Sequence, residues 1–338
     1  MKKGSLSRYL LVRVLLTIPM LFILLTLIFM LLRVAPGNPV KAALGMRLPP
    51  EMIAQRIHAL GYDDPIYQQY FRYLGNALTG EFGDPLTDRR SVVQIVAETA
   101  PATFELAFAA MIVAVMVGIT VGGLAGRLRD TPFDFGGRLY GILIYAIPPF
   151  WLALLAQLFF AVRLGWLPSS GRIGAFNAPE DITGFYVIDS VITGDWAALN
   201  STLLHLVLPA VTLGLIIGGT LVRLVRVNML QTLRSDYVEA SRARGIRERH
   251  VVYRHAFRNA LIPVITIMGL QFALLLGNAT LTETVFTWPG IARALVQFIG
   301  ARDYAAVQGI VTFIALVIVA FSLLIDFINA LVDPRVRY

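Results

Sequence analysis

The chain has 338 residues, of which 57% are hydrophobic and only 15% are charged, and its mean hydropathy is +0.70. This composition excludes an ordinary soluble domain and predicts an integral membrane protein. The formal charge is +8, and all but three of the 29 basic residues are arginine. Because the arginines lie in loops between apolar runs, we do not expect a nucleic acid partner. There is no cysteine, which excludes disulfides and thiolate metal sites.

The first predicted membrane span is Val14–Leu32, an uncharged run that follows a basic N-terminal segment. Its length is sufficient to cross the hydrocarbon core of a bilayer. A cleaved signal peptide is the alternative, but no small-residue cleavage pattern follows the run. We therefore expect an uncleaved first span.

The segment from residue 33 to residue 100 is polar and mixed in charge. Within it, Pro50 precedes a predicted helix over Glu51–Leu60, and Asp64-Pro65 opens a second helix that runs to about Leu78. A segment of this length is too long for a turn. We expect a small subdomain outside the membrane.

Five further uncharged runs predict helical spans, which gives an all-α membrane protein with six transmembrane helices. Lys and Arg are concentrated in the N-terminal segment, in the second and fourth short connections and at the C-terminus. By the positive-inside rule both termini, and the polar stretch Arg223–Arg258, are expected to be cytoplasmic. The five runs are Leu106–Gly126, Leu139–Val162, Leu203–Val222, Ala260–Thr282 and Tyr304–Ile325.

The polar stretch Arg223–Arg258 contains nine arginines and three acidic residues. Asp236 followed by Glu239 resembles a capping box, and Gly245 is suited to end a helix in the left-handed conformation. The pattern predicts a short helix over Tyr237–Arg244, which needs a surface to pack on because two turns are marginal in water. A solvated cytoplasmic loop is the alternative, but it explains only the arginines. The apolar residues of the helix favour a partner protein as that surface; they are Tyr237, Val238, Ala240 and Ala243.

The sequence Glu239-Ala240-Ser241-x3-Gly245 resembles the EAA loop of ABC importer permeases. In that family the loop forms a coupling helix that docks into a cleft of the ATPase subunit. The sequence from His255 to Pro263 resembles the peptide-permease branch, which shares the histidine and the displaced proline. The resemblance implies an ATPase-coupling role for Asp236, Tyr237, Glu239, Ala240, Ser241, Ala243, Gly245, His255, Arg258, Asn259 and Pro263.

Between the fifth and sixth predicted spans, a turn precedes the segment Ile291–Ile299. We expect Ile291, Leu295, Phe298 and Ile299 to share one face of a short amphipathic or re-entrant helix at the outer mouth. An interfacial anchor at Trp288 is the alternative. We expect an outer gate or a binding-protein docking site at Glu283, Phe286, Trp288, Pro289, Gly290, Asp303 and Tyr304.

Catalytic and metal-binding motifs are absent from the sequence. No lysine has a P-loop context, and there is no His-Glu-x-x-His or Gly-x-Ser-x-Gly motif. A proton-coupled carrier would need an ionisable group near the bilayer midplane. Glu105, His205 and Asp326 are the candidates, but they lie at the ends of predicted spans, where loop or helix-end contacts are the better explanation. We therefore expect neither an enzyme nor a metal site.

The resemblance extends over nearly the whole chain and is to the first permease subunit of dipeptide and oligopeptide ABC importers. It implies a second homologous permease, two ATPase subunits that hold ATP and Mg, an extracytoplasmic solute-binding protein, a multi-pass place in the inner-membrane bilayer, and no cofactor on this chain. Its remaining motifs are Ala35–Pro39, with Asn38 in place of the usual acid, Gly80–Gly83, Ala100–Leu106, Thr282–Gly290, Arg302–Tyr304 and Asp333–Arg337.

The expected layout assigns the N-terminus and first span to residues 1–32, the outer subdomain to 33–100, the permease core with coupling loop 223–259 to 101–331, and a cytoplasmic tail to 332–338.

The implied mechanism is alternating access driven by ATP, so replacing Glu239 or Gly245 is expected to uncouple hydrolysis from transport. Nickel chelates, glutathione and opines are alternative substrates within the family. A stand-alone secondary carrier and a membrane scaffold are alternatives of other classes.

Overall fold

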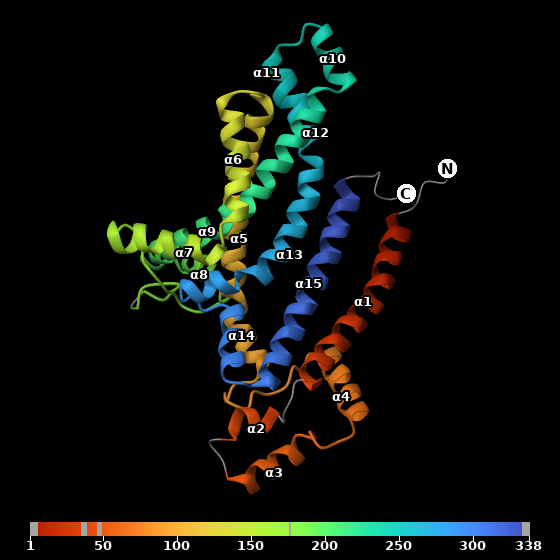
Figure 1. The fold of residues 1–338 in the computed structure, drawn as a ribbon, viewed down its shortest axis with the longest axis vertical. Helices are drawn as coiled ribbons and strands as arrows, with labels where there is room; N and C mark the ends of the chain where they lie inside the picture. Colours follow the sequence, from red (N-terminus) through yellow and green to blue (C-terminus); the bar gives the residue numbers. More distant parts are fainter. Residues whose placement is uncertain (1–5, 35–38, 46–48, 176, 333–338) are drawn as a thin grey trace. The chain divides into compact units, whose positions relative to one another are not determined.

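The computed structural model describes residues 6–34, 39–45, 49–175 and 177–332, and within these ranges the chain forms helices and no strand. By their internal contacts the residues form two compact units, whose boundaries fall inside α5, in the turn before α14 and inside α15. Figure 1 shows the ribbon with its helix labels. The elements are α1 (Leu6–Val34), α2 (Pro39–Leu44), α3 (Pro50–Ala59), α4 (Ile66–Thr79), α5 (Val92–Arg127), α6 (Pro132–Ala146), α7 (Pro149–Ala156), the π-helical η1 (Gln157–Arg163), α8 (Tyr186–Thr193), α9 (Trp196–Leu233), α10 (Asp236–Ala243), α11 (Glu248–His250), the π-helical η2 (Val251–Ala256), α12 (Phe257–Ala260), α13 (Ile262–Val285), α14 (Ile291–Gly300) and α15 (Tyr304–Val332).

Unit 1 comprises Met1–Thr103 and Pro289–Leu324. The two helices predicted after the first span are confirmed as α3 and α4, and Gly80 ends α4 in the left-handed conformation at φ 81°. Aromatic rings join α4 to α1, since Phe29 lies 5.2 Å from Tyr70 between ring centroids. The Tyr70 hydroxyl also lies 2.6 Å from the Thr26 hydroxyl oxygen. Motif residues Ala35 to Asn38 and Asp333 to Arg337 lie outside the described residues.

Unit 2 comprises Phe104–Trp288 and Ile325–Tyr338. Its longest element is α9, whose 38 residues continue the predicted fourth span well into the polar stretch. Small residues let α5 and α9 approach closely, as they do in membrane helix pairs. A Cβ on Gly122 would lie 2.7 Å from the Val222 carbonyl oxygen, and one on Gly214 would lie 2.6 Å from the Ala110 carbonyl oxygen. Leucine or valine at either position would separate the two helices.

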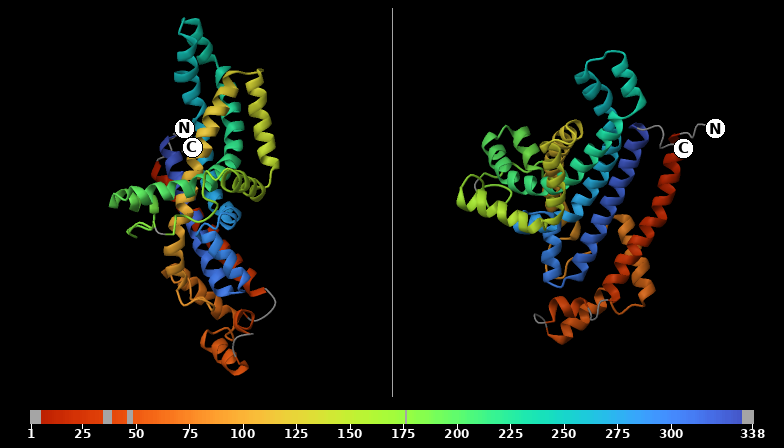
Figure 2. Two further views of the ribbon diagram at one scale, coloured as in Figure 1. Left: turned by 90° about the vertical axis from the view of Figure 1, so that its left-hand side faces the viewer. Right: turned by 45° about the horizontal axis from the view of Figure 1, so that its top comes forward.

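The expectation of one continuous helix over Leu139–Val162 is wrong. The run is divided into α6 and the α7–η1 segment, which are bent by 104° relative to each other. The cause is the pair Pro148-Pro149, because the ring of a proline disfavours the helical conformation in the preceding residue. Ile147 is accordingly extended, with ψ 124°. Figure 2 shows α7 leaving the axis of α6.

The described part of the chain contains four helices that are long and apolar enough to cross a membrane, or five if the bent α6–α7 pair is one span. The four are in α1, α5, α9 and α15. The remaining predicted span corresponds to α13, a helix of 24 residues. The fold is therefore all-α and membrane-spanning, and the count of six spans stays a prediction.

The close approach of α5 and α9 predicts opposite effects for two glycine-to-alanine changes. Gly122→Ala places a methyl group against the Val222 carbonyl, whereas a Cβ on Gly136 of α6 would meet nothing within 4 Å. Overpacking costs about 1–3 kcal/mol, and alanine otherwise favours a helix by about 0.5–1 kcal/mol over glycine. We expect Gly122→Ala to lower the melting midpoint of the purified protein by roughly 3 °C or more. Gly136→Ala should leave it equal or higher; equal midpoints for both variants would contradict this packing.

Candidate coupling site

Residues 234–261 connect α9 to α13 and fold into a compact segment, here called the coupling hairpin, which contains α10, α11, η2 and α12. Figure 1 shows these elements grouped at one end of unit 2. The predicted helix over Tyr237–Arg244 is confirmed, shifted by one residue to Asp236–Ala243. The predicted coupling residues therefore lie in one hairpin, except Pro263, which stands in the first turn of α13.

The predicted capping box at the start of α10 is wrong. The N-cap residue is Ser235, and no side chain caps the helix. The Ser235 hydroxyl donates instead to the Thr232 carbonyl oxygen at 2.5 Å, which continues the end of α9. Asp236 and Glu239 still lie in the first turn, where their negative charges favour the helix dipole.

The end of α10 agrees with the sequence. Gly245 has φ +72°, a conformation that costs glycine nothing and side-chain-bearing residues about 1–2 kcal/mol. Its N–H donates to the Arg242 carbonyl at 2.9 Å, and the Ile246 N–H donates to the Ser241 carbonyl at 3.3 Å. These two bonds form a Schellman motif, which directs the chain sharply back toward α11.

The hairpin has its own apolar core. Val238 of α10 is fully buried, and Ile246 packs against the same cluster. The surface that α10 needs is thus partly supplied by this chain, which corrects the expectation that Val238 faces a partner. The buried members of the cluster are Met229, Val238, Val251, Val252, Ala256 and Ala260.

Polar contacts fix both ends of α10. Asn259 donates through Nδ2 to the Tyr237 hydroxyl at 3.0 Å. Arg242 binds both carboxylate oxygens of Glu248, at 3.1 and 2.8 Å. These hydrogen bonds from Arg242 hold the pKa of Glu248 below its usual range, so the pair persists at neutral pH. Both side chains are about half exposed, so the pair orients the hairpin more than it stabilises it.

The hairpin also contacts the end of α5. Arg127 donates to the Tyr253 hydroxyl at 2.9 Å, and its guanidinium lies 5.4 Å from the centre of the Tyr253 ring. A Cβ on Gly123 would lie 3.0 Å from the Phe257 ring. Movement of η2 or α12 would therefore displace α5 as well as α9 and α13.

The outward surface of α10 carries most of the remaining predicted coupling residues. Tyr237 is 42% exposed although its hydroxyl is bonded within the hairpin. Ser241 and His255 are half-buried, and Arg258 and Asn259 are exposed. A concave surface beside α11 and η2 is lined by Arg247, Arg249, Arg254 and Arg258. Its positive charge suits a negatively charged partner. The exposed positions of α10 and its end are Asp236, Tyr237, Glu239, Ala240, Arg242, Ala243, Arg244 and Gly245.

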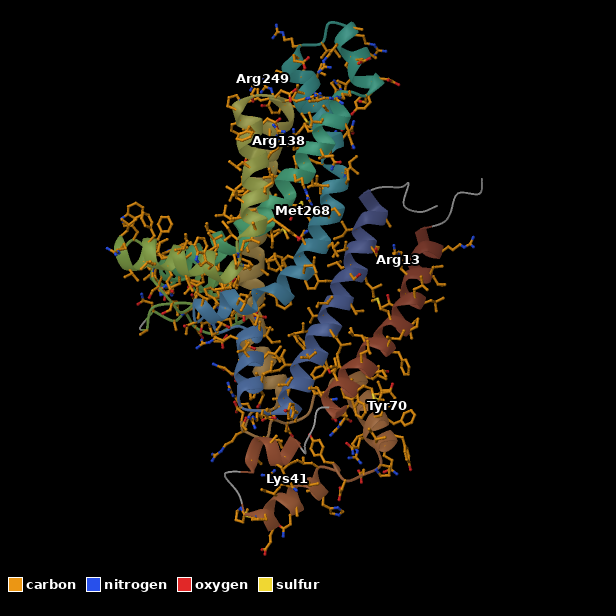
Figure 3. All side chains as sticks on the ribbon, in the orientation of Figure 1. Arg13, Lys41, Tyr70, Arg138, Arg249 and Met268 are labelled. Carbon is orange, nitrogen blue, oxygen red and sulfur yellow. The ribbon has the colours of Figure 1, made fainter. Side chains whose placement is uncertain are left out.

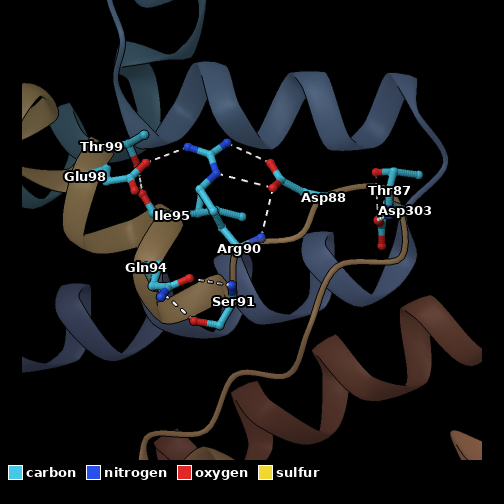
Figure 4. A network of polar contacts seen from close by, with 9 residues as sticks. All are labelled: Thr87, Asp88, Arg90, Ser91, Gln94, Ile95, Glu98, Thr99 and Asp303. Carbon is cyan, nitrogen blue, oxygen red and sulfur yellow. Dashed lines mark hydrogen bonds and ion pairs between the residues drawn. The ribbon is translucent and has the colours of Figure 1, made fainter.

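The predicted outer residue Asp303 has an internal structural role. Its side chain is fully buried at the start of α15, where Oδ1 accepts from the Ala306 N–H at 3.1 Å. Oδ2 accepts from the backbone N–H groups of Leu86 and Thr87 at 2.6 and 2.7 Å. Figure 4 shows Asp303 beside Thr87, together with the ion pairs of Arg90 in the same loop. Asp303 thus anchors the loop before α5 to α15 within unit 1.

Arg90 in this loop is bound to two carboxylates. It donates to Asp88 at 2.7 Å and to Glu98 at 2.5 Å. The hydrogen bonds from Arg90 lower the pKa of Asp88 to about 2. Because the pKa of Asp88 is lower in the folded protein, the pair contributes fully to the free energy of unfolding above about pH 4. That contribution is lost as the pH falls toward 2 and the carboxylate is protonated.

Other predicted outer residues are also internal. Glu283, Phe286 and Trp288 are buried, which contradicts an interfacial anchor at Trp288. The α13 helix ends in a Schellman motif with Thr287 at φ +53°, a strained conformation for a β-branched residue. The Trp288 N–H donates to the Glu283 carbonyl at 2.8 Å. Strain of this kind at a helix end is held by the surrounding packing.

The expected amphipathic helix is confirmed as α14, with one difference in its buried face. Ile291 and Phe298 are buried, and Leu295 is half-buried. Ile299 is 56% exposed, because the buried face is completed by Ala292 and Ala294 instead. Of the remaining predicted outer residues, Gly290 is buried, Tyr304 is half-buried and Pro289 is exposed.

Sequence reasoning identified Glu105 but missed its partner. The side chains of Glu105 and Arg172 are both 5% exposed and form an ion pair at 2.8 Å. Arg172 donates to Glu105 through Nε at 2.8 Å, and through Nη2 to the Gly184 carbonyl oxygen at 2.8 Å. The other carboxylate oxygen accepts the Val187 N–H at 2.8 Å. His205 lies 2.7 Å, through Nδ1, from the Ser201 carbonyl oxygen of its own helix. The explanation by loop contacts is confirmed for Glu105. His205 is instead bonded within α9, which begins at Trp196, so the expectation that it lies at a helix end is wrong. One signal for the missed pair was available, since Arg172 is an isolated arginine in a turn-rich segment that is predicted to be outside.

Two family models match the chain. The model described as "Binding-protein-dependent transport system inner membrane component" matches residues 118–338, and its N-terminal companion matches residues 6–107. The chain belongs to this family. It is therefore a permease of a binding-protein-dependent transport system in the inner membrane, and ATPase and binding-protein subunits are the general partners of such permeases.

The similar curated proteins cover almost the whole permease. The di/tripeptide transport system permease protein DppB of Pseudomonas aeruginosa is 40% identical over 96% of each chain. The dipeptide permease DppB of Escherichia coli K12 is 37% identical over 98% of this chain and 99% of its own. That of Alkalihalophilus pseudofirmus is 37% identical over 96% and 98%.

One solved structure supports the fold of the permease. The crystal structure of an amino acid ABC transporter with histidines aligns at a TM-score of 0.50 and 14% identity, over 70% of this chain and 94% of the other. At this identity the likeness concerns the fold alone. Among the residues described for the permease, no group of three His, Cys, Asp or Glu side chains could hold a metal ion.

The core under α10 predicts how the coupling helix is held. Val238→Ala removes buried methyl groups and costs about 2 kcal/mol. We expect amide hydrogen exchange in residues 236–245 to become roughly 30-fold faster in the purified permease, because α10 opens as a local unit. Val227→Ala on α9 is the control, since Val227 is 40% exposed. Unchanged exchange in Val238→Ala would show that α10 does not depend on this core.

Proposed function

We propose that this permease imports dipeptides and short oligopeptides in an ATP-driven complex. The permease family and the substrates in the names of relatives at 37–40% identity support the proposal. The observation that carries the coupling mechanism is the structure of α10, whose buried Val238 holds a helix with an exposed acidic and small-residue surface.

The exposed surface of α10 is the proposed docking element for an ATPase subunit. Ala240 and Ala243 leave room for a close approach, and Asp236 and Glu239 offer carboxylates at a helix start. Gly245 ends α10 in the left-handed conformation and has no side chain, so the chain can turn away from the proposed ATPase cleft without steric conflict. The arginines beside α11 and η2 provide a second contact of opposite charge to an acidic partner surface.

The hairpin transmits motion because it packs as one body. Closure of the ATPases on ATP would move α10, and the core shared with Met229 and Ala260 would carry that motion to α9 and α13. The Arg127–Tyr253 contact would carry it to α5. Substrate released by the binding protein then crosses between this chain and a second, homologous permease by alternating access.

The partners in this proposal are the second permease, two ATPase subunits and an extracytoplasmic solute-binding protein. ATP and Mg belong to the ATPase subunits, and this chain binds no cofactor and catalyses no reaction. Both termini and the coupling hairpin are cytoplasmic, as the distribution of arginine predicts. The buried residues Glu283, Phe286 and Trp288 shape the outer end of unit 2, and the buried Asp303 shapes that of unit 1.

A stand-alone proton-coupled carrier is the alternative that the structure makes less favourable. Its carboxylate would have to bind and release a proton during transport. Glu105 is instead held by Arg172 and by the Val187 N–H, and His205 is bonded within its own helix. A nickel-chelate substrate has no support from a ligand cluster among the described residues.

The deciding experiment measures uptake and hydrolysis together. The complex is reconstituted in liposomes with its binding protein, and uptake of a labelled dipeptide is measured alongside ATP consumption. We expect uptake to require ATP and to survive collapse of the proton gradient. Glu239→Ala and Gly245→Val should lower the number of peptides imported per ATP at least about tenfold, since valine is strongly disfavoured at positive φ.

Gly245→Asn is the matched control, because asparagine tolerates the left-handed conformation and a Cβ at this position meets nothing within 4 Å. It should keep most of the coupling, and all variants should still assemble. Uptake without ATP would favour a secondary carrier. Wild-type coupling in Gly245→Val would remove the proposed role of the hairpin.

A further inference from the structure

A groove of about 390 Å³ runs between α6 and α9 within unit 2. Gly137, Gly141 and Gly219 are among its lining residues. Because these glycines have no side chains, the two helices lie close together and space remains along their surface. The Gly141 position faces the Gly219 carbonyl oxygen, which would lie 3.6 Å from a Cβ at Gly141. The groove is independent of the coupling hairpin and has no role in the proposed function above.

The walls of the groove are apolar along most of its length. Ile142 is 67% exposed and Tyr145 is 88% exposed, and Ile216 and Val222 line the other side. Side chains of this kind on a membrane span are suited to contact with hydrocarbon chains. The groove can therefore hold an acyl chain along its apolar part.

One end of the groove is strongly basic. Arg138, Arg223 and Arg226 line it. Asp134, which is fully buried, binds Arg226 at 2.5 and 2.9 Å and lies 3.9 Å from Arg138. Arg223 is exposed, and no ion pair joins it to another of the described residues. The Asp130 carboxylate is also near Arg226, but it is paired with Arg129 at 2.9 Å. Three arginines of the groove thus face the single carboxylate of Asp134, which leaves an excess of positive charge at this end.

The basic end is on the side of the coupling hairpin. Figure 3 shows Arg138 on the part of α6 nearer to Arg249 of the hairpin, with Met268 of α13 farther along. This side is predicted to be cytoplasmic, where anionic lipid head groups attract basic residues. The long arginine side chains at a span end can reach the head-group layer while their stems cover apolar surface.

We propose that the α6–α9 groove binds one anionic phospholipid of the inner leaflet. Its phosphate is held by Arg138 and Arg223, and an acyl chain lies along Ile142, Tyr145 and Ile216. Charge complementarity decides the class of ligand, because a zwitterionic lipid would not neutralise the excess positive charge. Arg226 is committed to Asp134 and positions α6 on α9 rather than binding lipid.

The test is made on the whole importer complex, purified in mild detergent from native membranes. Native mass spectrometry quantifies phosphatidylglycerol, cardiolipin and phosphatidylethanolamine that remain bound to this chain. We expect retained anionic lipid in the wild type and about 30-fold weaker retention in the Arg138→Gln, Arg223→Gln double variant, since each arginine near the surface contributes about a factor of five. The control is the Arg89→Gln, Arg163→Gln double variant, which removes equal charge at two exposed positions outside the groove and should retain the lipid.

A second measurement covers the case in which the double variant fails to assemble. Photoactivatable phosphatidylglycerol is added to the wild-type complex in liposomes of phosphatidylethanolamine, and labelled peptides are identified. We expect labels on residues of α6 and α9 that line the groove. Equal lipid retention in both double variants, or labels spread evenly over all spans, would overturn the proposal.

The competing occupant is a helix of the second permease. Because the chain has no cysteine, Tyr145→Cys provides a single site for disulfide formation with single cysteines placed in that subunit. We expect little cross-linking at Tyr145 while lipid is retained. High-yield cross-linking to the second permease, without lipid labelling, would identify the groove as a subunit interface and contradict lipid binding.

Discussion

The burial of Val238 against α9 and η2 is the constraint on which the coupling hairpin depends. Two turns of helix are not stable in water without such a contact. By placing its one β-branched residue inside, α10 leaves its acidic and alanine positions outward. The same cluster includes residues of α9 and α12, so the helix that would receive force from a partner is joined to the elements that lead into the membrane. A rigid connection requires this kind of packing, because packed cores move as units.

Buried ionic contacts complete this arrangement outside the hairpin. Glu105 and Arg172 connect the start of the second span to the loop before α8, and Asp134 and Arg226 connect α6 to α9. In each case a charge removed from water is matched by a partner and by backbone donors. Removing one partner alone would leave a buried charge, which is more damaging than replacing the whole pair. These pairs specify which elements lie together in unit 2.

Much of the fold and part of the site follow from local sequence rules. Gly245 indicated the end of α10, Pro50 indicated the start of α3, Gly80 indicated the end of α4, and the apolar runs indicated the spans. These features depend on backbone conformation and burial, which single residues reveal. The Pro148-Pro149 pair is a local signal for the 104° bend, but the run Leu139–Val162 has no charged residue and was therefore interpreted as one continuous span.

Other features depend on contacts between distant residues. The capping box failed because Ser235 bonds backward to Thr232, and nothing in the motif itself distinguishes Asp236 from Ser235 as the N-cap. The Arg172 partner of Glu105 is 67 residues away in the chain. Burial of Val238 rather than Tyr237 depends on the position of η2. Long-range pairing of this kind has no local signal.

Site-specific cross-linking in the assembled complex tests the central claim directly. The chain has no cysteine, so Ala240→Cys introduces a single thiol on the exposed surface of α10, which is then labelled with a photoreactive maleimide. We expect a strong adduct with an ATPase subunit, increased by ATP. Trp166→Cys, at an exposed position in the predicted outer loop, should give none. An Ala240→Cys adduct confined to lipid or to the binding protein would contradict the coupling role of α10.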